Sequence, residues 1–219
     1  MKKRLTVLIS GRGSNLESLI RHAESYQVTS IVTNSLDAPG IAFGSEFNIP
    51  VEIRDRKDFS SLTDCKDAIF KAVQKTAPDF VALAGFMQIL QPKFVEHYFG
   101  RLLNIHPSLL PLYPGLDTHQ RALEDQQKEH GCTVHFVDSG MDTGPIIAQS
   151  SVEVLNDETV ASLQQKVLTK EHLIYPWAMN LVASGDIQIN ERNVTYSKKA
   201  LESAKEMNFK IKLGEQNGN

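Results

Sequence analysis

The sequence predicts an α/β protein: an open, mostly parallel, twisted sheet with helices on both faces, followed by a small C-terminal hairpin. Three observations lead to this prediction. Short apolar runs alternate with helical patterns through about residue 110, as in sheets built from right-handed β–α–β crossovers. The run at 80–84 is apolar at successive positions, as expected for a parallel strand covered on both faces. Further along, the β segments 131–137 and 146–154 flank one polar loop.

The elements of the first half follow from where the apolar runs stop. The run at 5–9 is expected to be a strand ended by glycines, and Leu16, Leu19 and Ile20 then show the i, i+3, i+4 spacing of an amphipathic helix. In order, we expect a strand at 5–9, a helix at 15–25, a strand at 30–33, a short helix at 39–46, a strand at 51–53, a helix at 67–75 and a strand at 80–84.

After its two β segments, the second half is predicted to carry a long helix and a hairpin. The helical pattern covers 160–183 and is interrupted by Pro176, because proline lacks the backbone N–H that a helix interior uses. Residues 187–196 are expected to form the hairpin. No linker divides residues 1–198, which we expect to be one domain. Residues 199–219 are charged and polar, and are expected to be a frayed tail.

Composition narrows the class of protein. The 219 residues are 41% hydrophobic and 22% charged, with a formal net charge of −3, which suits a soluble enzyme and not a sequence-independent nucleic-acid binder. Cys65 and Cys132 are too few and too far apart for a disulfide framework or a zinc site. The apolar run at 5–9 is too short for a secretion signal, and no run is long enough to span a membrane. We expect a cytoplasmic protein without metal, membrane or nucleic-acid partners.

A glycine-rich turn at residues 10–15 lies between the first expected strand and helix. Backbone N–H groups of such a turn and the positive end of the helix bind anions. The turn lacks the third glycine of a dinucleotide fingerprint, where Leu16 stands, and it lacks the lysine of a Walker A loop. Ser14 and Asn15 add side-chain donors, which suits one phosphate monoester. The alternative is an ordinary β–α turn with a helix cap.

Residues 85–90 follow the strand at 80–84 and offer a wall for a flat heterocycle. They leave the strand at its carboxyl edge, where open α/β sheets bind ligands. Met87 and Leu90 provide adaptable apolar contacts. The alternative is core packing at a strand end, but the position of the segment one strand from Asn104 favours a ligand wall.

The most informative segment is 104–111, Asn-Ile-His-Pro-Ser-Leu-Leu-Pro. Alternation along a strand directs Asn104 and His106 to the same side, and the prolines stiffen the exit. An amide donor beside an imidazole suits a carbonyl oxygen that gains negative charge. Asp142, in the later polar loop, could supply the carboxylate partner of the imidazole; its alternative role is to stabilise a turn. The other histidines are expected to be structural or surface residues.

Together these motifs resemble the folate-dependent formyltransferase family, from about residue 5 to about residue 186. The motifs are Ile9–Gly11 with Gly13–Asn15, Leu83–Met87, Leu103–Pro111, Tyr113–Gly115, Asp142 with Gly144–Pro145, and Glu171–His172 with Tyr175–Pro176. The resemblance implies a Rossmann-like fold. It places phosphate and acceptor binding in the N-terminal half of residues 1–198, and folate binding and catalysis in the C-terminal half.

The resemblance also implies roles for residues. Asn104, His106 and Asp142 would be the catalytic amide, imidazole and carboxylate. The phosphate and ribose of 5'-phosphoribosylglycinamide (GAR) would be bound by Gly13, Ser14, Asn15 and Glu171. The folate would contact Met87, Gln88, Ile89 and Leu90, and the backbone of Asp138, Ser139, Gly140 and Met141.

Three positions depart from the family pattern. Gln88 and Leu62 stand where arginines that help to hold the folate are expected, although Arg54 or Arg56 could substitute. Asp117 replaces a histidine in the loop 115–119, which bears on any pH-dependent ordering of that loop.

The implied reaction transfers the formyl group of 10-formyltetrahydrofolate to the amine of GAR in purine (IMP) biosynthesis, by a monomer or homodimer. Asn104 would donate to the oxyanion, and His106, oriented by Asp142, would stabilise it. Two alternatives stay open. A methionyl-tRNA type of formyltransferase shares the segment 104–111 but carries an added RNA-binding domain, for which we expect no room after the hairpin. A non-catalytic phosphosugar-binding module is the alternative from a different class.

Overall fold

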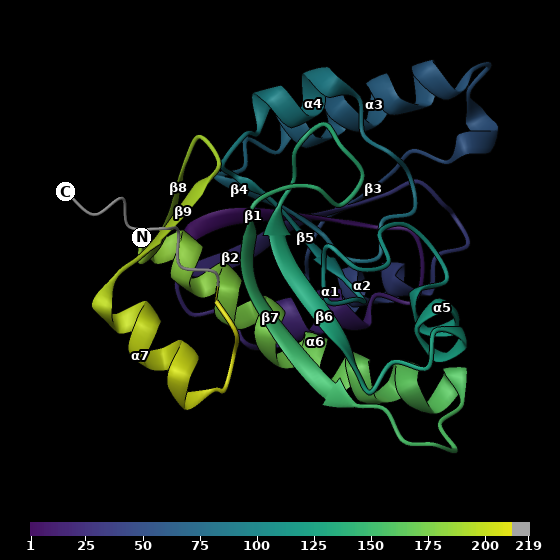
Figure 1. The fold of residues 1–219 in the computed structure, drawn as a ribbon. Coiled ribbons are helices and arrows are strands. Elements are labelled where there is room, and N and C mark those ends of the chain that lie inside the picture. Colours follow the sequence, from purple (N-terminus) through teal and green to yellow (C-terminus); the bar gives the residue numbers. More distant parts are fainter. Residues whose placement is uncertain (212–219) are drawn as a thin grey trace. The chain divides into compact units, whose positions relative to one another are not determined.

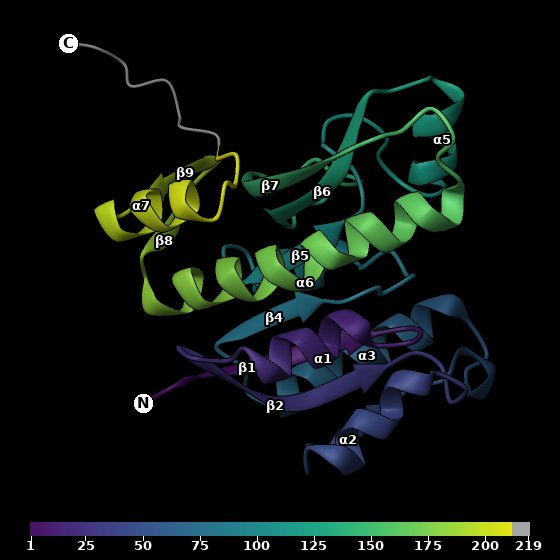
Figure 2. The same cartoon turned by 90° about the horizontal axis from the view of Figure 1, so that it is seen from below.

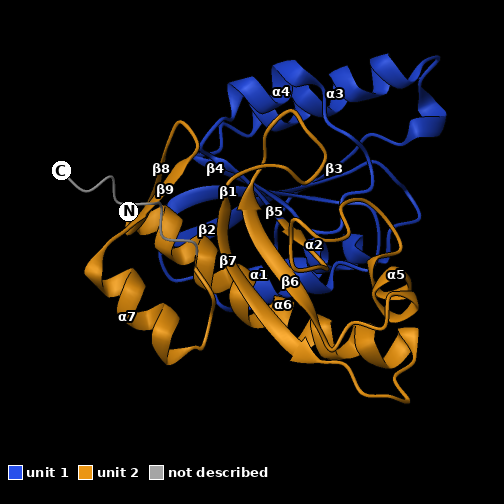
Figure 3. Ribbon diagram, viewed as in Figure 1, with its two compact units in different colours: residues 1–104 blue, residues 105–219 orange. Residues whose placement is uncertain are grey.

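The computed structural model describes residues 1–211. Its contacts divide the chain into two compact units, residues 1–104 and residues 105–219, which Figure 3 colours separately. Unit 1 contains the predicted phosphate loop, and unit 2 contains His106 and Asp142. The functional division between an N-terminal and a C-terminal half of one domain stays a prediction.

Strands and helices alternate along unit 1 (Figure 1). Its strands are parallel and follow the order β3-β2-β1-β4-β5. The elements are β1 (Lys3–Ile9), α1 (Ser14–Arg21), β2 (Tyr26–Thr33), the 3-10 helix η1 (Pro39–Ile41), α2 (Ala42–Glu46), β3 (Val51–Ile53), the 3-10 helix η2 (Arg56–Asp58), α3 (Leu62–Lys75), β4 (Phe80–Leu83), α4 (Pro92–His97) and β5 (Leu102–His106), which crosses the boundary between the units.

The central strand of unit 1 is buried on both faces. Every side chain of β1 from Leu5 to Ile9 is inaccessible to solvent. Continuous burial of this kind is typical of a parallel strand covered on both sides. Leu8 pairs with Leu83, so β1 and β4 end at the same edge of the sheet. The loops that follow these two strands, which contain two of the predicted sites, therefore start close together.

Unit 2 combines an antiparallel strand pair with one long helix. The helix α6 packs along β6 and β7, and Figure 2 shows it running beneath both strands. The pairing of β6 with β7 brings Thr133 opposite Gln149. The elements are α5 (Thr118–Glu124), β6 (Glu129–Phe136), β7 (Ile146–Glu153), α6 (Val160–Ser184), the hairpin strands β8 (Ile187–Asn190) and β9 (Asn193–Tyr196), and α7 (Lys198–Glu206).

The predicted fold class is confirmed. The strand order over the described residues is β3-β2-β1-β4-β5-β6-β7, and β8 and β9 form a separate hairpin. Most neighbouring strands of the larger sheet are parallel, whereas β6 and β7 are antiparallel. No helix in residues 1–211 is both long enough and apolar enough to cross a membrane.

Several element boundaries differ from the prediction. The first helix ends at Arg21, and β2 begins at Tyr26 because the chain pairs with β1 from that residue onward. The Tyr26 hydroxyl donates to Leu19 O at 2.8 Å, which ties the start of β2 to α1. The helices α4 and α5 were not predicted, because six or seven residues are too few to show a helical period.

The predicted interruption of the long helix at Pro176 is wrong. The helix α6 continues through Pro176 to Ser184, and this proline is buried. Tertiary packing therefore outweighs the loss of one backbone hydrogen bond. The helix begins with a capping box, in which Thr159 accepts from the backbone N–H of Ser162.

The expectation of a frayed tail is wrong for residues 199–211. Residues 198–206 form α7, whose N-cap Ser197 accepts from the Ala200 N–H. Two aromatic rings, Trp177 of α6 and Phe209 after α7, meet edge to face with centroids 5.1 Å apart. The apolar residues among the charges, which the prediction overlooked, thus fix this segment. Residues 212–219 lie outside the described part.

Candidate active site

The predicted phosphate loop is a tight turn between β1 and α1. Gly13 precedes the helix with φ 77°, and a Cβ on it would lie 2.9 Å from Gly40 Cα. The Gly40 N–H donates to Gly11 O at 3.0 Å, so two glycine turns pack against each other. Gly13 is therefore required both by its conformation and by the close approach. Ser14 opens α1, and the first N–H groups of a helix have no acceptor within the helix.

The segment 85–90 is joined to this loop within unit 1. The Ser10 hydroxyl oxygen accepts from the Met87 N–H at 2.8 Å, and the Ser10 N–H donates to Gly85 O at 3.2 Å. Met87 and Ile89 point outward, with 73% and 68% of their surface exposed. Exposed apolar side chains beside a polar turn are suited to a ligand.

The other two residues of the predicted folate wall are half-buried. Gln88 is turned toward the interior near the Cys65 thiol, and its Oε1 is buried without a hydrogen-bond partner. Burial raises the pKa of this thiol, and the nearby Gln88 side chain acts in the opposite direction. Leu90 is half-buried as well. In the described structure, Gln88 is thus half-buried at a position where the family pattern has an arginine.

Asn104 and His106 both lie on β5, separated by the buried Ile105. Asn104 pairs with Leu83 of β4, and it is half-buried. Two positions apart on one strand, the amide and the imidazole extend from the same face of the strand. This arrangement follows from the strand itself, as predicted.

The imidazole of His106 is enclosed and has an oxygen atom at each nitrogen. Only 5% of the residue is exposed. Nε2 lies 2.9 Å from Tyr113 O, and because a carbonyl can only accept, Nε2 carries a proton. Nδ1 lies 3.4 Å from Asp142 Oδ2. The structure therefore brings the predicted imidazole and carboxylate together, with the imidazole held from its far side by a backbone carbonyl.

Asp142 occupies a strained position in the loop between β6 and β7. Its φ is 54°, and its Oδ2 accepts from the Gly115 N–H at 2.8 Å. Oδ1 lies 3.8 Å from His135 Nε2. Burial lowers the pKa of His135, and the carboxylate of Asp142 acts in the opposite direction. A left-handed backbone at a residue other than glycine is frequent at functional sites.

A second pair of histidines lies behind Tyr113. His130 Nε2 is 3.1 Å from His119 Nδ1, and the rings of Tyr113 and His130 are in edge contact. Burial lowers the pKa of His130 to about 4, and it also lowers the pKa of His119. The prediction gave these histidines no role in the site. No signal in the sequence distinguishes them, because their clustering arises from the fold.

The predicted folate loop, 138–141, is ordered by its own side chains. Asp138 Oδ1 accepts from the Gly140 N–H at 3.1 Å and from the Thr143 hydroxyl at 2.7 Å. Ser139, Gly140 and Met141 are exposed. Their backbone groups are therefore presented to solvent on a loop that is closed at its base, where the Phe136 N–H donates to Pro145 O.

Glu171 lies on α6 and is 7% exposed. It is close enough to the buried Cys132 thiol to raise the pKa of that thiol, although burial is the larger cause. A buried carboxylate on a regular helix is held in one place, which a substrate contact requires. Its predicted role toward GAR stays a prediction.

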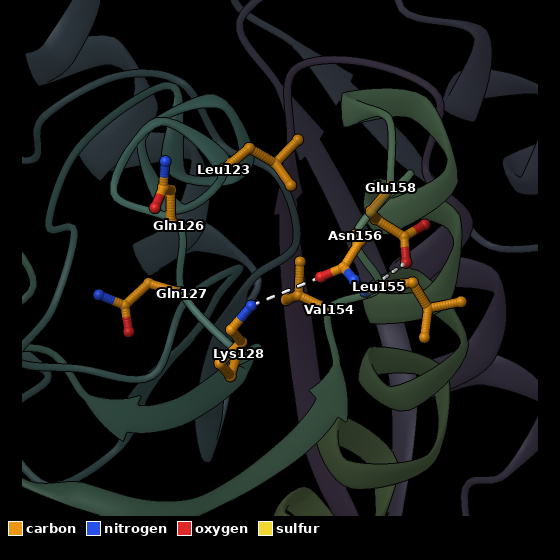
Figure 4. Close-up of a pocket in the computed structure, with 8 residues that line it drawn as sticks. All are labelled: Leu123, Gln126, Gln127, Lys128, Val154, Leu155, Asn156 and Glu158. Carbon is orange, nitrogen blue, oxygen red and sulfur yellow. Dashed lines mark hydrogen bonds between the residues drawn. The ribbon is translucent and has the colours of Figure 1, made fainter.

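A cavity of about 340 Å³ lies elsewhere in unit 2, beside the turn that precedes β6 (Figure 4). Side-chain hydrogen bonds join residues of its lining: Lys128 Nζ donates to Asn156 Oδ1 at 3.5 Å, and the Leu155 N–H donates to Glu158 Oε2 at 3.5 Å. Its lining residues are Leu123, Gln126, Gln127, Lys128, Val154, Leu155, Asn156 and Glu158. None of them is a predicted site residue, and we do not assign this cavity to the chemistry. Among residues 1–211, no cluster of His, Cys, Asp and Glu side chains could hold a metal ion.

The comparisons with known proteins identify formyltransferases. A family model described as Formyl transferase matches residues 3–179. The phosphoribosylglycinamide formyltransferase of Escherichia coli (strain K12) is 42% identical over 191 residues, which cover 85% of this chain and 90% of that protein. The enzyme of the same name from Haemophilus influenzae is 37% identical over 203 residues, which cover 91% and 96%.

Solved structures and longer proteins agree with these matches. The crystal structure of glycinamide ribonucleotide transformylase 1 from Symbiobacterium toebii superposes with a TM-score of 0.86 at 37% identity, covering 90% of this chain and 95% of that one. The Trifunctional purine biosynthetic protein adenosine-3 of Chironomus tentans is 41% identical over 197 residues. The matched region spans only 14% of the length of that longer protein.

Proposed function

Since this chain belongs to the formyl transferase family, we propose that it transfers the formyl group of 10-formyltetrahydrofolate to the amine of GAR. The product would be formylglycinamide ribonucleotide, an intermediate on the way to IMP. The observation that carries the proposal is the pairing of His106 with Asp142 at 3.4 Å, beside Asn104 on the same strand. The two bacterial relatives named phosphoribosylglycinamide formyltransferase support the choice of acceptor.

The reaction forms one C–N bond and breaks another. The GAR amine attacks the formyl carbon, and the carbonyl π electrons move to the oxygen. When the tetrahedral centre collapses, the bond from carbon to N10 of the folate breaks, and the amine proton is transferred in net terms to that nitrogen. The protein must therefore stabilise an oxyanion and assist a proton transfer.

Asn104 and His106 are suited to stabilising the oxyanion. The Asn104 amide can donate an N–H to the oxyanion, and a strand holds this donor without the cost of reorganisation. His106 Nε2–H is anchored on Tyr113 O, so Nδ1 is the nitrogen that faces the carboxylate side. A protonated imidazole there adds a positive charge beside the developing negative charge.

Asp142 is suited to assisting the proton transfer. Its Oδ2 lies 3.4 Å from Nδ1, which is longer than a charge-assisted hydrogen bond of about 2.7–2.9 Å, so the carboxylate faces the ring without a full hydrogen bond to it. The Gly115 N–H holds the other side of the same oxygen. The carboxylate thus orients the ring, and a water molecule bound at this carboxylate could carry the proton from the amine to N10.

The remaining predicted residues bind the two substrates. Gly13, Ser14 and Asn15 would hold the GAR phosphate through the N–H groups at the start of α1, and Glu171 would contact the glycinamide ribose. Met87, Ile89 and Leu90 would pack on the pterin, whose polar edge suits the exposed backbone of Asp138, Ser139, Gly140 and Met141. Gln88 would contribute through its backbone, because its side chain is turned to Cys65. We propose that the protein acts in the cytoplasm as a monomer or homodimer.

The test is a direct assay. Purified protein is mixed with GAR and 10-formyltetrahydrofolate, and formylated GAR and tetrahydrofolate are quantified by mass spectrometry. We expect one tetrahydrofolate for each formylated GAR, and no formylation of methionyl-tRNA. Turnover close to that of the parent protein in His106→Ala or Asp142→Asn would contradict the assigned roles. Binding of GAR without turnover would indicate a phosphosugar-binding module instead.

A further inference from the structure

The loop between β6 and β7 is held by a side chain from the hairpin near the C-terminus. Arg192, in the turn between β8 and β9, donates from Nη1 to Asp138 Oδ2 at 2.8 Å. It also donates from Nη2 to Thr143 O at 2.7 Å. Asp138 and Thr143 lie near the two ends of the loop, so one planar guanidinium bridges them. A lysine could not make this pair of hydrogen bonds in the same geometry, because its ammonium group is a single point charge and not a planar group with two donor nitrogens.

The two ends of the loop are also joined to each other. The Thr143 hydroxyl and the Gly140 N–H both donate to Asp138 Oδ1, which leaves Oδ2 for Arg192. Burial acts to raise the pKa of Asp138, but the hydrogen bonds from Thr143, Arg192 and Gly140 lower it below its ordinary value. Asp138 is therefore charged at neutral pH, and both of its oxygens hold the loop.

Asp142 lies within this loop, directly before Thr143. Its left-handed backbone leaves little freedom, and its carboxylate reaches His106 Nδ1 and the Gly115 N–H. Thr143 follows Asp142 directly in the chain, so a displacement of Thr143 would also displace Asp142. The contact with His106 is already 3.4 Å long, so a small displacement would break it.

We propose that Arg192 is a positioning residue that fixes the Asp138–Thr143 loop and thereby keeps the Asp142 carboxylate at His106. Its place in catalysis rests on the proposed function, whereas its control of the loop does not. Arg192 is 66% exposed, and exposed ion pairs contribute little to the free energy of unfolding. Its loss should therefore move the loop while leaving global stability nearly unchanged.

The first arm of the test measures loop placement without substrate. Amide hydrogen exchange is followed by NMR at Gly140, whose N–H is bonded to Asp138, and at Gly115, whose N–H is bonded to Asp142. In Arg192→Ala we expect exchange at both amides to accelerate by about tenfold, as local opening becomes easier. Glu191→Gln, in the same turn, is the matched control and should leave both rates unchanged. Unchanged exchange in Arg192→Ala would overturn the proposal.

The second arm measures kinetics. Arg192→Ala should lower kcat by roughly tenfold, because misplacing a catalytic group by about 1 Å is costly, with Tm close to that of the parent. Arg192→Lys should recover part of the loss, since it keeps the charge but not the fork. In an Asp142→Asn background, Arg192→Ala should add no further loss, because both changes act through one carboxylate.

The outcomes separate the two proposals. If kcat of the double variant falls by the product of the two single-variant factors, Arg192 does not act through Asp142, and the proposal is overturned. If the parent protein does not formylate GAR, the proposed function fails, and the exchange rates at Gly115 and Gly140 still decide whether Arg192 controls the loop.

Discussion

The buried histidine pair behind Tyr113 makes the stability of unit 2 depend on pH. His130 is 1% exposed, and its pKa of about 4 lies below the ordinary value of 6.5. Between these values the unfolded chain binds more protons than the folded one, so stability falls as pH falls. This contribution is complete above pH 6.5, is lost between pH 6.5 and 4, and changes no further below pH 4.

The magnitude follows from the two pKa values. For one site with these values, lowering the pH from 7 to 5 reduces the free energy of unfolding by about 2 kcal/mol. His119 and His135 have lowered pKa values as well and act in the same direction. The carboxylates with lowered pKa values contribute at more acidic pH: the pKa of Asp186 is lowered to about 2 by hydrogen bonds from Ser184, Ser197 and Lys199.

The assay is urea unfolding at pH 7 and pH 5, followed by the fluorescence of Trp177, the one tryptophan of the chain, which lies in the same unit as His130. His130→Gln keeps an amide for His119 but removes the titrating ring, so its loss of stability between the two pH values should be smaller than that of the parent by about 2 kcal/mol. His97→Gln, which changes an exposed ring, is the control. An equal loss in parent and His130→Gln, or an NMR titration of the His130 ring above pH 6, would refute the reasoning.

Three other predictions concern the site and the packing. Asn104→Ala should reduce kcat by roughly 10²–10³, the usual cost of removing one oxyanion donor, in a steady-state assay; an unchanged kcat would exclude that role. Gly13→Ala adds a Cβ that would meet Gly40 Cα at 2.9 Å, so the KM for GAR should rise at least tenfold while the KM for the folate changes little. Phe209→Ala removes the ring that packs on Trp177 and should destabilise the protein by about 3 kcal/mol in urea unfolding; a loss below 1 kcal/mol would mean that this contact is not a stabilising one.

Most of the fold could be predicted because periodicity and glycine positions are local signals. Continuous burial of β1 and the stripe of α1 both follow from apolar spacing. The errors have physical causes: the start of β2 at Tyr26 depends on pairing with β1, and α6 continues through Pro176 because the helix is packed along its length. The segment around Phe209 is fixed by a partner on α6, which no local pattern reveals.

The site also contains features that the sequence predicts and features that it does not. The proximity of His106 and Asp142 could be predicted because their chemistry is carried by side-chain types in short motifs, and the catalytic roles of Asn104, His106 and Asp142 stay predictions. The groups that hold them could not: Tyr113 O and the Gly115 N–H are backbone atoms, which any residue could supply. Arg192 lies in a hairpin far along the chain from the loop that it holds, and nothing in the sequence marks it as different from other exposed arginines.

The last residues of the described chain also bear on solubility. The strand β7 ends the sheet, so its outer backbone groups would be free to pair with a strand of another molecule. Two neighbouring outward positions are occupied instead: the Tyr196 hydroxyl donates to Ile147 O, and Gln149 exchanges both backbone hydrogen bonds with Lys210. Tyr196 and Lys210 thus occupy outward backbone groups of β7 and hinder its pairing with a strand of another molecule. A protein shortened before Lys210 would keep Asn104, His106 and Asp142 and yet present a template for intermolecular β-sheet growth.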